Sequence, residues 1–337
     1  MRTVKAASIS VLAWTHRALT GSLLLLACLA VSPAKAERIL LRDLVNGVTM
    51  TQAQCAALPE AVWVKAMGRQ LCIRYYLSKA GGSGARAMVF LQGDKLGKLY
   101  ASWRFQSPEP DAFIETDNLK RLADSMSRQS KTTAIYLARI GVDGSSGHHR
   151  ARKSVLELHV INAALDAIKA RHKLEGFHLV GQSGGATLVG GLLGLRNDIA
   201  CAVPGAGKLA RIKPVGHSSN PERQYFDPSA SFAAIVRNGS ARILVVTDPA
   251  DERVNVEHQV AFVRGLRAAG GQVEQLFVQA IDKSRHGVSV YAVHAAASCV
   301  LGKSNEEIAR SVAKLVERRV TAAEQRAADD AKQAKAR

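Results

Sequence analysis

One short segment constrains the fold of this 337-residue chain more than any other. It runs from Phe177 to Leu188 and reads FHLVGQSGGATL, a G-x-S-x-G pattern between an apolar run and a small-residue run. This order indicates a buried strand that turns sharply into a helix and exposes the hydroxyl of Ser183 on the turn. Gly181 and Gly185 fit that interpretation, because side chains there would collide where strand and helix cross closely. The alternative is an ordinary glycine-rich turn.

A second serine-rich stretch, Gly144 to Gly147, lacks the second spaced glycine. We interpret it as a loop rather than as a second candidate for a reactive serine.

Strand-like and helix-like segments alternate from residue 72 onwards. We expect strands at 72–77, 87–91, 133–138, 177–180, 199–203, 241–246 and 273–278. Between them we expect helices, the first at 119–127. The clearest helix has Ser154 as its N-cap, and its apolar positions follow three- and four-residue steps. Those apolar positions are Leu158, Ile161, Leu165 and Ile168. In the helix after Ser183, three glycines should allow close packing against the sheet, namely Gly190, Gly191 and Gly194. The β–α order predicts an α/β fold with a mostly parallel sheet and helices on both faces.

The first 36 residues have the pattern of a secretory signal peptide. Basic residues precede an apolar run from Leu19 to Val31, and Ala34-Lys35-Ala36 fits a cleavage site that leaves Glu37 as the new N-terminus. The apolar run is short for a membrane span, so no stable span is expected. A lipoprotein signal at Cys28 is less favoured, because apolar sequence continues past it. We therefore expect a periplasmic or secreted protein.

The remaining chain divides by its patterning. We expect an N-terminal extension at 37–71, the α/β domain at 72–303, and a charged helical tail at 304–337. Residues 208–240 interrupt the β–α order with prolines and serines, which indicates irregular structure and a small cap over the sheet.

Four cysteines remain after cleavage, an even number that suits an oxidising compartment. We favour pairs Cys55–Cys72, which are close in sequence, and Cys201–Cys299, which would join a core strand to a late helix. Buried free thiols are the alternative. No C-x-x-C pattern supports a metal site, and we expect no metal or organic cofactor.

The formal net charge is +18, and removal of four basic signal residues lowers it to about +14. The basic residues are dispersed and are not interleaved with aromatic residues. This pattern favours a solvated basic surface over nucleic-acid binding. The sequence does not indicate an oligomeric state.

A serine hydroxyl needs a base, and the base needs a group that orients it. Ligands of such sheets bind beyond the carboxyl ends of the strands, so candidates should follow strands. The acid candidate is Asp251, one turn beyond the strand at 241–246. Asp248 is the second choice and Glu252 the third, and all three could be ordinary loop carboxylates.

The base candidate is His286, in the loop after the last strand. His258 and His294 fall inside predicted helices and are interpreted as surface or packing residues.

The order serine, aspartate, histidine over residues 72–300 resembles the α/β-hydrolase superfamily. Asp251 with Val254 is similar to the family's D-x-x-V acid turn, and His286-Gly287 is similar to its terminal histidine loop. The resemblance implies a Ser183–His286–Asp251 triad.

The family often has His-Gly after its third core strand, where a main-chain N–H completes the oxyanion hole. This chain has Gln92-Gly93-Asp94-Lys95 there. We expect the N–H groups of Asp94 and Gly184 to stabilise the oxyanion, with the Asp94 side chain pointing away from it.

These features predict a secreted serine hydrolase that acts on a small-molecule or peptide substrate, with carboxylic esters favoured. A serine peptidase or a non-catalytic binding protein of the same fold is the alternative. The pocket should be shaped by residues 95–115, 141–152 and 208–240. Five basic residues could meet an anionic group or simply face solvent, namely Arg139, His148, His149, Arg150 and Arg285.

Overall fold

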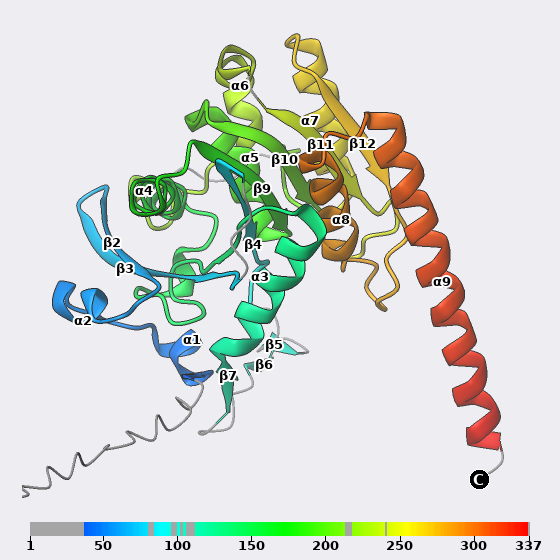
Figure 1. Ribbon diagram of the computed structural model, residues 1–337, viewed down its shortest axis with the longest axis horizontal. Helices are drawn as coiled ribbons and strands as arrows, with labels where there is room; N and C mark the ends of the chain where they lie inside the picture. Colours follow the sequence, from blue (N-terminus) through cyan, green and yellow to red (C-terminus); the bar gives the residue numbers. More distant parts are fainter. Residues whose placement is uncertain are drawn as a thin grey trace, which may run out of the picture. The chain divides into compact units, whose positions relative to one another are not determined.

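A central sheet of eight strands organises the part of the chain that the structure describes (Figure 1). This is a computed structural model, and it describes residues 37–79, 84–95, 100–101, 104–105, 112–212, 218–239 and 241–335. The expected signal peptide, with Cys28 and the cleavage site, lies outside these residues. Parts of the segments 95–115 and 208–240 also lie outside them.

The sheet is mostly parallel, as the alternating sequence pattern predicts. In spatial order its strands are β12 (Val273–Phe277), β11 (Arg242–Thr247), β10 (Ile199–Gly205), β9 (Gly176–Gln182), β4 (Arg86–Leu91), β8 (Ala134–Leu137), β3 (Arg69–Leu77) and β2 (Ala61–Ala66). The first six run parallel, whereas β3 pairs antiparallel with both β8 and β2. The central strands are buried on both faces, which explains why their sequences are apolar throughout rather than alternating.

Helices cover both faces of this sheet. On one face lie α4 (Val155–His172), α5 (Gly184–Leu195) and α7 (Glu257–Ala268), and on the other lie α3 (Thr116–Ser130), α8 (Ser289–Val300) and the first turns of α9 (Asn305–Lys335). The predicted tail thus begins as a packed helix, since Ile308 and Val312 are buried in the second core. The α/β architecture is confirmed.

Helix α4 forms as its sequence pattern predicts. The Ser154 hydroxyl accepts a hydrogen bond from the main-chain N–H of Glu157, and all four apolar residues named above are buried.

The glycines of α5 act differently from our expectation. A Cβ at Gly190 would meet Pro228 and Leu209, and one at Gly191 would meet Phe226 and Leu158. These glycines therefore allow close approach of Leu209, Phe226, Pro228 and helix α4, rather than of the sheet.

Smaller elements surround the sheet. They are α1 (Arg42–Asn46), α2 (Gln52–Ala56), the pair β1 (Arg38–Leu40) and β7 (Phe113–Glu115), the pair β5 (Tyr100–Ala101) and β6 (Arg104–Phe105), and the 3-10 helices η2 (His149–Ala151) and η3 (Pro228–Ser231). Within 208–240, residues Phe232–Asn238 form helix α6, so this segment is less irregular than its prolines indicate. Strand β3 begins at Arg69 and β2 belongs to the main sheet, so the sheet extends into residues 61–71, part of the expected N-terminal extension.

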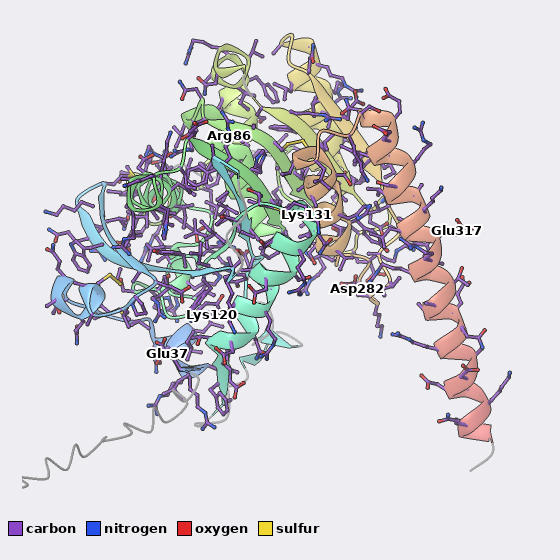
Figure 2. The ribbon with its side chains drawn as sticks, in the orientation of Figure 1. Glu37, Arg86, Lys120, Lys131, Asp282 and Glu317 are labelled. Carbon is purple, nitrogen blue, oxygen red and sulfur yellow. A yellow bond between two sulfur atoms is a disulfide. The ribbon has the colours of Figure 1, made fainter. Side chains whose placement is uncertain are left out.

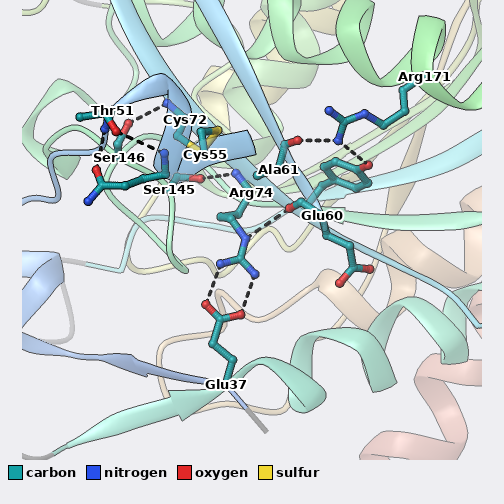
Figure 3. The surroundings of a disulfide bond; sticks show 12 residues. Glu37, Thr51, Cys55, Glu60, Ala61, Cys72, Arg74, Ser145, Ser146 and Arg171 are labelled. Atoms are coloured by element: carbon teal, nitrogen blue, oxygen red, sulfur yellow. Dashed lines mark hydrogen bonds and ion pairs between the residues drawn. A yellow bond between two sulfur atoms is a disulfide. The ribbon is translucent and has the colours of Figure 1, made fainter. Parts of the chain in front are cut away.

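Both favoured cysteine pairs lie at bonding distance. Cys55 in α2 joins Cys72 in β3, and Cys201 in β10 joins Cys299 in α8. Figure 3 shows the first disulfide next to the serine-rich loop, where the hydroxyl of Ser146 accepts a hydrogen bond from the Cys72 N–H. The hydroxyl of Ser145 does the same for Arg74, so this loop supports β3.

Among the described helices, none combines the length and apolar character needed to span a membrane.

Candidate active site

Ser183 lies on the turn between β9 and α5, at the carboxyl end of the sheet. Its φ of 55° and ψ of −117° are strained for a residue with a side chain. The two flanking glycines are required by packing. A Cβ at Gly181 would lie 2.5 Å from the Gly185 carbonyl carbon, and one at Gly185 would lie 2.0 Å from the Leu91 oxygen. The sequence therefore fixes a sharp turn that only glycines permit around the serine.

Asp251 and His286 are in direct contact. Oδ2 of Asp251 lies 2.7 Å from Nδ1 of His286. Oδ1 of Asp251 accepts hydrogen bonds from the main-chain N–H groups of Arg253 (2.8 Å) and Val254 (3.0 Å), and the aspartate is 9% exposed. The D-x-x-V turn thus orients the carboxylate toward the imidazole. If Nδ1 carries the proton of that hydrogen bond, Nε2 is the nitrogen able to accept one.

The loop that carries His286 is fixed on two sides. Asp282, labelled in Figure 2 on the segment before α8, accepts hydrogen bonds from the N–H groups of His286 (3.2 Å) and Gly287 (2.7 Å). On the other side, Nε2 of Gln182 donates to the main-chain oxygen of His286 over 2.7 Å. Gln182 precedes Ser183, so the serine turn and the histidine loop are linked through it. Within the described residues, Ser183 and the His286 ring are not joined by a direct hydrogen bond, and such bonds are often long before substrate binds.

Asp248, the second acid candidate, has other partners. Its carboxylate binds the guanidinium of Arg285 with distances of 2.8 and 3.0 Å and accepts the Ala280 N–H over 2.7 Å. The main-chain N–H of Glu252 donates to the Ser284 oxygen over 3.0 Å. The acid turn and the histidine loop are therefore held together by contacts separate from the Asp251–His286 hydrogen bond.

The two helical histidines have partners other than Asp251, although His258 also lines the cavity described below. His258 in α7 is hydrogen-bonded to the Ala210 oxygen through Nδ1, and His294 in α8 contacts the Ser311 hydroxyl.

Asp94 and Gly184 are adjacent on the other side of Ser183. A Cβ at Gly184 would lie 2.1 Å from Oδ1 of Asp94, which explains the glycine at this position. No acceptor in the described part of the chain receives a hydrogen bond from the main-chain N–H of either residue.

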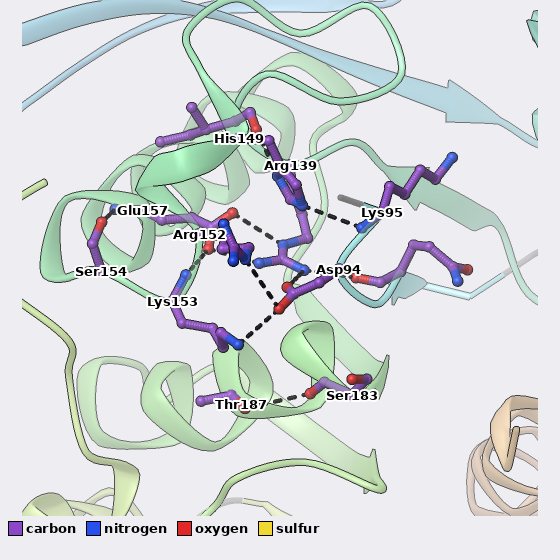
Figure 4. Close-up of polar contacts among 12 residues, drawn as sticks. Asp94, Lys95, Arg139, His149, Arg152, Lys153, Ser154, Glu157, Ser183 and Thr187 are labelled. Atoms are coloured by element: carbon purple, nitrogen blue, oxygen red, sulfur yellow. Dashed lines mark hydrogen bonds and ion pairs between the residues drawn. The ribbon is translucent and has the colours of Figure 1, made fainter. Parts of the chain in front are cut away.

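The Asp94 carboxylate is directed toward cations, as Figure 4 shows. It lies 2.8 Å from the guanidinium of Arg139 and 2.7 Å from the ammonium of Lys153. Burial opposes its charge, but these two cations outweigh burial and hold the pKa of Asp94 well below its usual range.

Arg139 is a buried structural cation. It is 1% exposed and makes a two-pronged ion pair with Glu157 of α4, at 3.0 and 2.8 Å. Arg285 is likewise paired with Asp248, so neither guanidinium meets the expectation of a free cation for an anionic group. Glu157 was not singled out in the sequence. Its place between two apolar residues of α4 is a signal that could have revealed a buried cation opposite it.

His149 supports the loop after β4. Its Nε2 accepts a hydrogen bond from the Lys95 N–H (3.3 Å), which leaves Nδ1 to donate to the Ile140 oxygen (3.1 Å). Burial, together with the nearby Arg139 charge, lowers the pKa of His149 to about 3. It is therefore a neutral packing residue.

A cavity of about 520 Å³ opens beside the first turn of α5. Thr187 contributes to its wall, and the Thr187 hydroxyl donates to the main-chain oxygen of Ser183 over 3.3 Å. The other described walls come from Lys153, from residues in 208–212 and 225–226, and from Asn255 and His258. Described residues of the expected pocket segment 208–240 thus form part of this cavity, whereas no described residue of 95–115 or 141–152 lines it. Among the described residues, no cluster of His, Cys, Asp or Glu side chains is arranged to hold a metal ion.

No protein-family model and no curated protein matches the chain in sequence. Solved structures do resemble it. An esterase from Pyrococcus furiosus aligns with a TM-score of 0.50 and 12% identity, over 75% of this chain and 93% of that one. An esterase from Butyrivibrio proteoclasticus with bound ferulic acid gives a TM-score of 0.48 and 15% identity, over 72% and 99%.

An acylaminoacyl peptidase from Pyrococcus horikoshii gives a TM-score of 0.47 and 15% identity over 70% of this chain. This chain spans only 39% of that protein. At such identities the likeness concerns architecture alone. Together with the strand order and the position of the serine turn, the match to the P. furiosus esterase shows that the chain has the α/β-hydrolase fold.

Proposed function

We propose that this protein is a secreted or periplasmic serine hydrolase that cleaves carboxylic esters through an acyl-enzyme. The observation that carries the proposal is the 2.7 Å contact between Asp251 and His286, next to a strained serine turn to which the histidine loop is hydrogen-bonded. A loop histidine held by a buried carboxylate has the orientation that a general base requires.

In the proposed mechanism, Nε2 of His286 takes the hydroxyl proton as Ser183 Oγ attacks the carbonyl carbon. Asp251 fixes the ring tautomer and stabilises the imidazolium that forms. His286 then gives this proton to the leaving alcohol, and the Ser183 acyl ester remains. Water attacks the ester with His286 again as the base, which releases the acid and restores the serine.

The main-chain N–H groups of Gly184 and Asp94 would stabilise the oxyanion of each tetrahedral intermediate. Their support is that both lie beside Ser183 and have no acceptor in the described part of the chain. Each such donor contributes about 3 kcal/mol to lowering the barrier. The Asp94 carboxylate is compensated by Arg139 and Lys153, which reduces its opposition to a nearby negative charge.

Esters are favoured over peptides with a free amino terminus, because binding that ammonium group calls for a carboxylate. Within the described walls of the cavity beside α5 there is no acidic side chain. The secreted location is supported by the two disulfides, which form in oxidising compartments. Mass spectrometry of the protein from its host's periplasm or medium should find Glu37 as the first residue.

A fluorophosphonate probe tests the nucleophile. We expect labelling of the wild type and none of Ser183→Ala, with both proteins folded by circular dichroism. Ser145→Ala, in the other serine-rich loop, is the matched control and should still be labelled. Labelling that persists in Ser183→Ala would remove Ser183 from its role.

A p-nitrophenyl ester and the p-nitroanilide of the same acyl group test the reaction class. Ser183-dependent ester cleavage with anilide cleavage at the background rate supports the proposal, because a peptidase also cleaves the more reactive ester. Ser183-dependent cleavage of the anilide would favour the peptidase. Background rates on both, and on a wider panel of acyl groups, would favour a binding protein.

A further inference from the structure

The cavity beside α5 has a cationic wall. Lys208 and Arg211, which follow the end of β10, line it from one side, and Lys153 lines it from another. Among its described lining residues there is no aspartate or glutamate. A substrate that enters this cavity therefore meets three cations, of which Lys153 is already paired with Asp94 over 2.7 Å.

Lys208 lacks compensation by a nearby anion. In the described part of the chain its ammonium makes no ion pair, and burial together with the charge of Lys153 lowers its pKa. The carboxylate whose charge acts on it is Asp94, which is already engaged by Arg139, Arg152 and Lys153. Glu157 also pairs with Arg139, so two carboxylates face the four cations Arg139, Arg152, Lys153 and Lys208.

Among the described residues, Arg211 makes no ion pair with an acidic side chain. Its guanidinium donates to the Phe226 main-chain oxygen over 3.5 Å and lies 6.0 Å from the centre of the Tyr225 ring. Neither contact neutralises its charge, so its other N–H groups remain able to bind an anion in the two-pronged geometry that guanidinium groups favour.

The rest of the described wall combines apolar and polar side chains, the polar ones being Thr187, Asn255 and His258. Ile212, Tyr225 and Phe226 supply apolar and aromatic surface. The main chain between the two cations is fixed, because Ala210 donates to the His258 oxygen over 3.0 Å and its own oxygen contacts the His258 ring over 2.6 Å. The two cations thus extend from an anchored segment rather than a free loop.

From this arrangement we infer that the cavity binds a carboxylate on the substrate, so that the preferred substrates are esters with an apolar body and a free acid group. The inference rests on the proposed function, since Thr187 connects the cavity wall to Ser183. Lys208 and Arg211 are then residues that determine specificity, outside the proposed triad and oxyanion groups.

Two pairs of esters test this inference. The first pair is the p-nitrophenyl monoester of adipic acid and the same ester with its terminal acid converted to a carboxamide. The second pair is the butanoate ester of 4-hydroxybenzoate and that of 4-hydroxybenzamide. The two members of a pair match in size and differ in charge. The first pair carries the charge on the acyl side of the ester, and the second pair carries it on the alcohol side. In at least one pair, we expect kcat/KM for the acid to exceed that for the carboxamide by about tenfold. This ratio should be smaller at 500 mM NaCl than at 50 mM, because salt screens the attraction between the charges.

Substitution of Lys208 and Arg211 tests whether the preference for acid substrates arises in this cavity. Lys208→Met and Arg211→Met should each reduce kcat/KM for the acid by about two- to fivefold, while the carboxamide rate stays within error. Arg237→Met is the matched control, because Arg237 lies exposed in α6 and is not part of this wall. It removes the same charge and should leave the preference unchanged.

Each outcome separates this inference from the proposed function. Ser183-dependent cleavage with no preference for either acid overturns the inference alone, as does an equal loss of preference in Arg237→Met. If no ester is cleaved, calorimetric binding of both pairs to Ser183→Ala still tests the cavity. Tighter binding of the acid that is lost in Lys208→Met supports it, and equal binding of acid and carboxamide overturns it.

Discussion

Gln182 donates a 2.7 Å hydrogen bond from Nε2 to the main-chain oxygen of His286. The residue that precedes the candidate nucleophile therefore holds the loop of the candidate base. Because the bond is made by a side chain, it can be removed without altering either of the two residues that it aligns.

Gln182→Met should lower kcat about tenfold with KM changed less than about twofold, because a misaligned base affects the reaction more than binding. Gln259→Met is the matched control. The Gln259 amide is buried without a partner among the described atoms, so its replacement should be neutral or stabilising. An equal loss of kcat in both variants would argue against a positioning role for Gln182.

Asp251→Asn should lower kcat by about 10³- to 10⁴-fold, because an amide does not stabilise the imidazolium. Asp248→Asn should cost less than about tenfold, because Asp248 contacts Arg285 and not the imidazole. Steady-state kinetics on one ester decides between them. The reverse order would transfer the role of the acid to Asp248.

His149 should make the protein sensitive to acid. Its pKa is about 3 in the fold and 6.5 ordinarily, so below pH 6.5 the unfolded chain binds a proton that the folded chain excludes. Stability is therefore complete above pH 6.5 and falls as the pH drops toward 3. Between pH 7 and pH 4.5 the loss is on the order of 2 kcal/mol.

Urea unfolding of the wild type and of His149→Gln at the two pH values measures this loss. The stability advantage of the wild type should shrink by that amount at pH 4.5. His178, whose pKa burial also lowers, to about 4, is present in both proteins and cancels. An advantage that stays constant with pH would contradict the assignment.

The two disulfides should differ in their effect on unfolding. They close segments with sequence separations of 98 and 17 residues. The chain-entropy relation gives about 4.7 kcal/mol for the longer loop and about 3 kcal/mol for the shorter. Replacing both cysteines of a pair by alanine should lower the free energy of unfolding in urea more for Cys201–Cys299 than for Cys55–Cys72. Equal losses would indicate that local packing, and not loop length, decides.

Features that depend on local pattern were predictable from the sequence. The serine turn follows from glycines spaced around Ser183, and α4 from the spacing of its apolar residues behind Ser154. The strands are recognisable because a parallel sheet buried on both faces needs continuous apolar runs.

The resemblance to a known family implied the Asp251–His286 contact, and Cys201–Cys299 was the favoured pair, but other contacts between distant residues were not predictable. Asp94 meets Arg139 and Lys153 only because β4 and β8 are neighbours in the sheet, and the chain order does not give that adjacency. The cavity wall at Lys208 and Arg211 comes from a segment with neither helical nor strand periodicity. The sequence therefore does not show that these cations line a cavity beside α5.

The backbone of Ser183 has a cost that the rest of the fold must offset. A residue with a side chain at a positive φ outside the helical region is destabilised by roughly 1–3 kcal/mol, whereas glycine tolerates such angles. Ser183→Gly should therefore raise the melting temperature above that of Ser183→Ala, although both lack the hydroxyl. Replacing a glycine by serine at this turn would then supply the hydroxyl and lower the melting temperature in the same step.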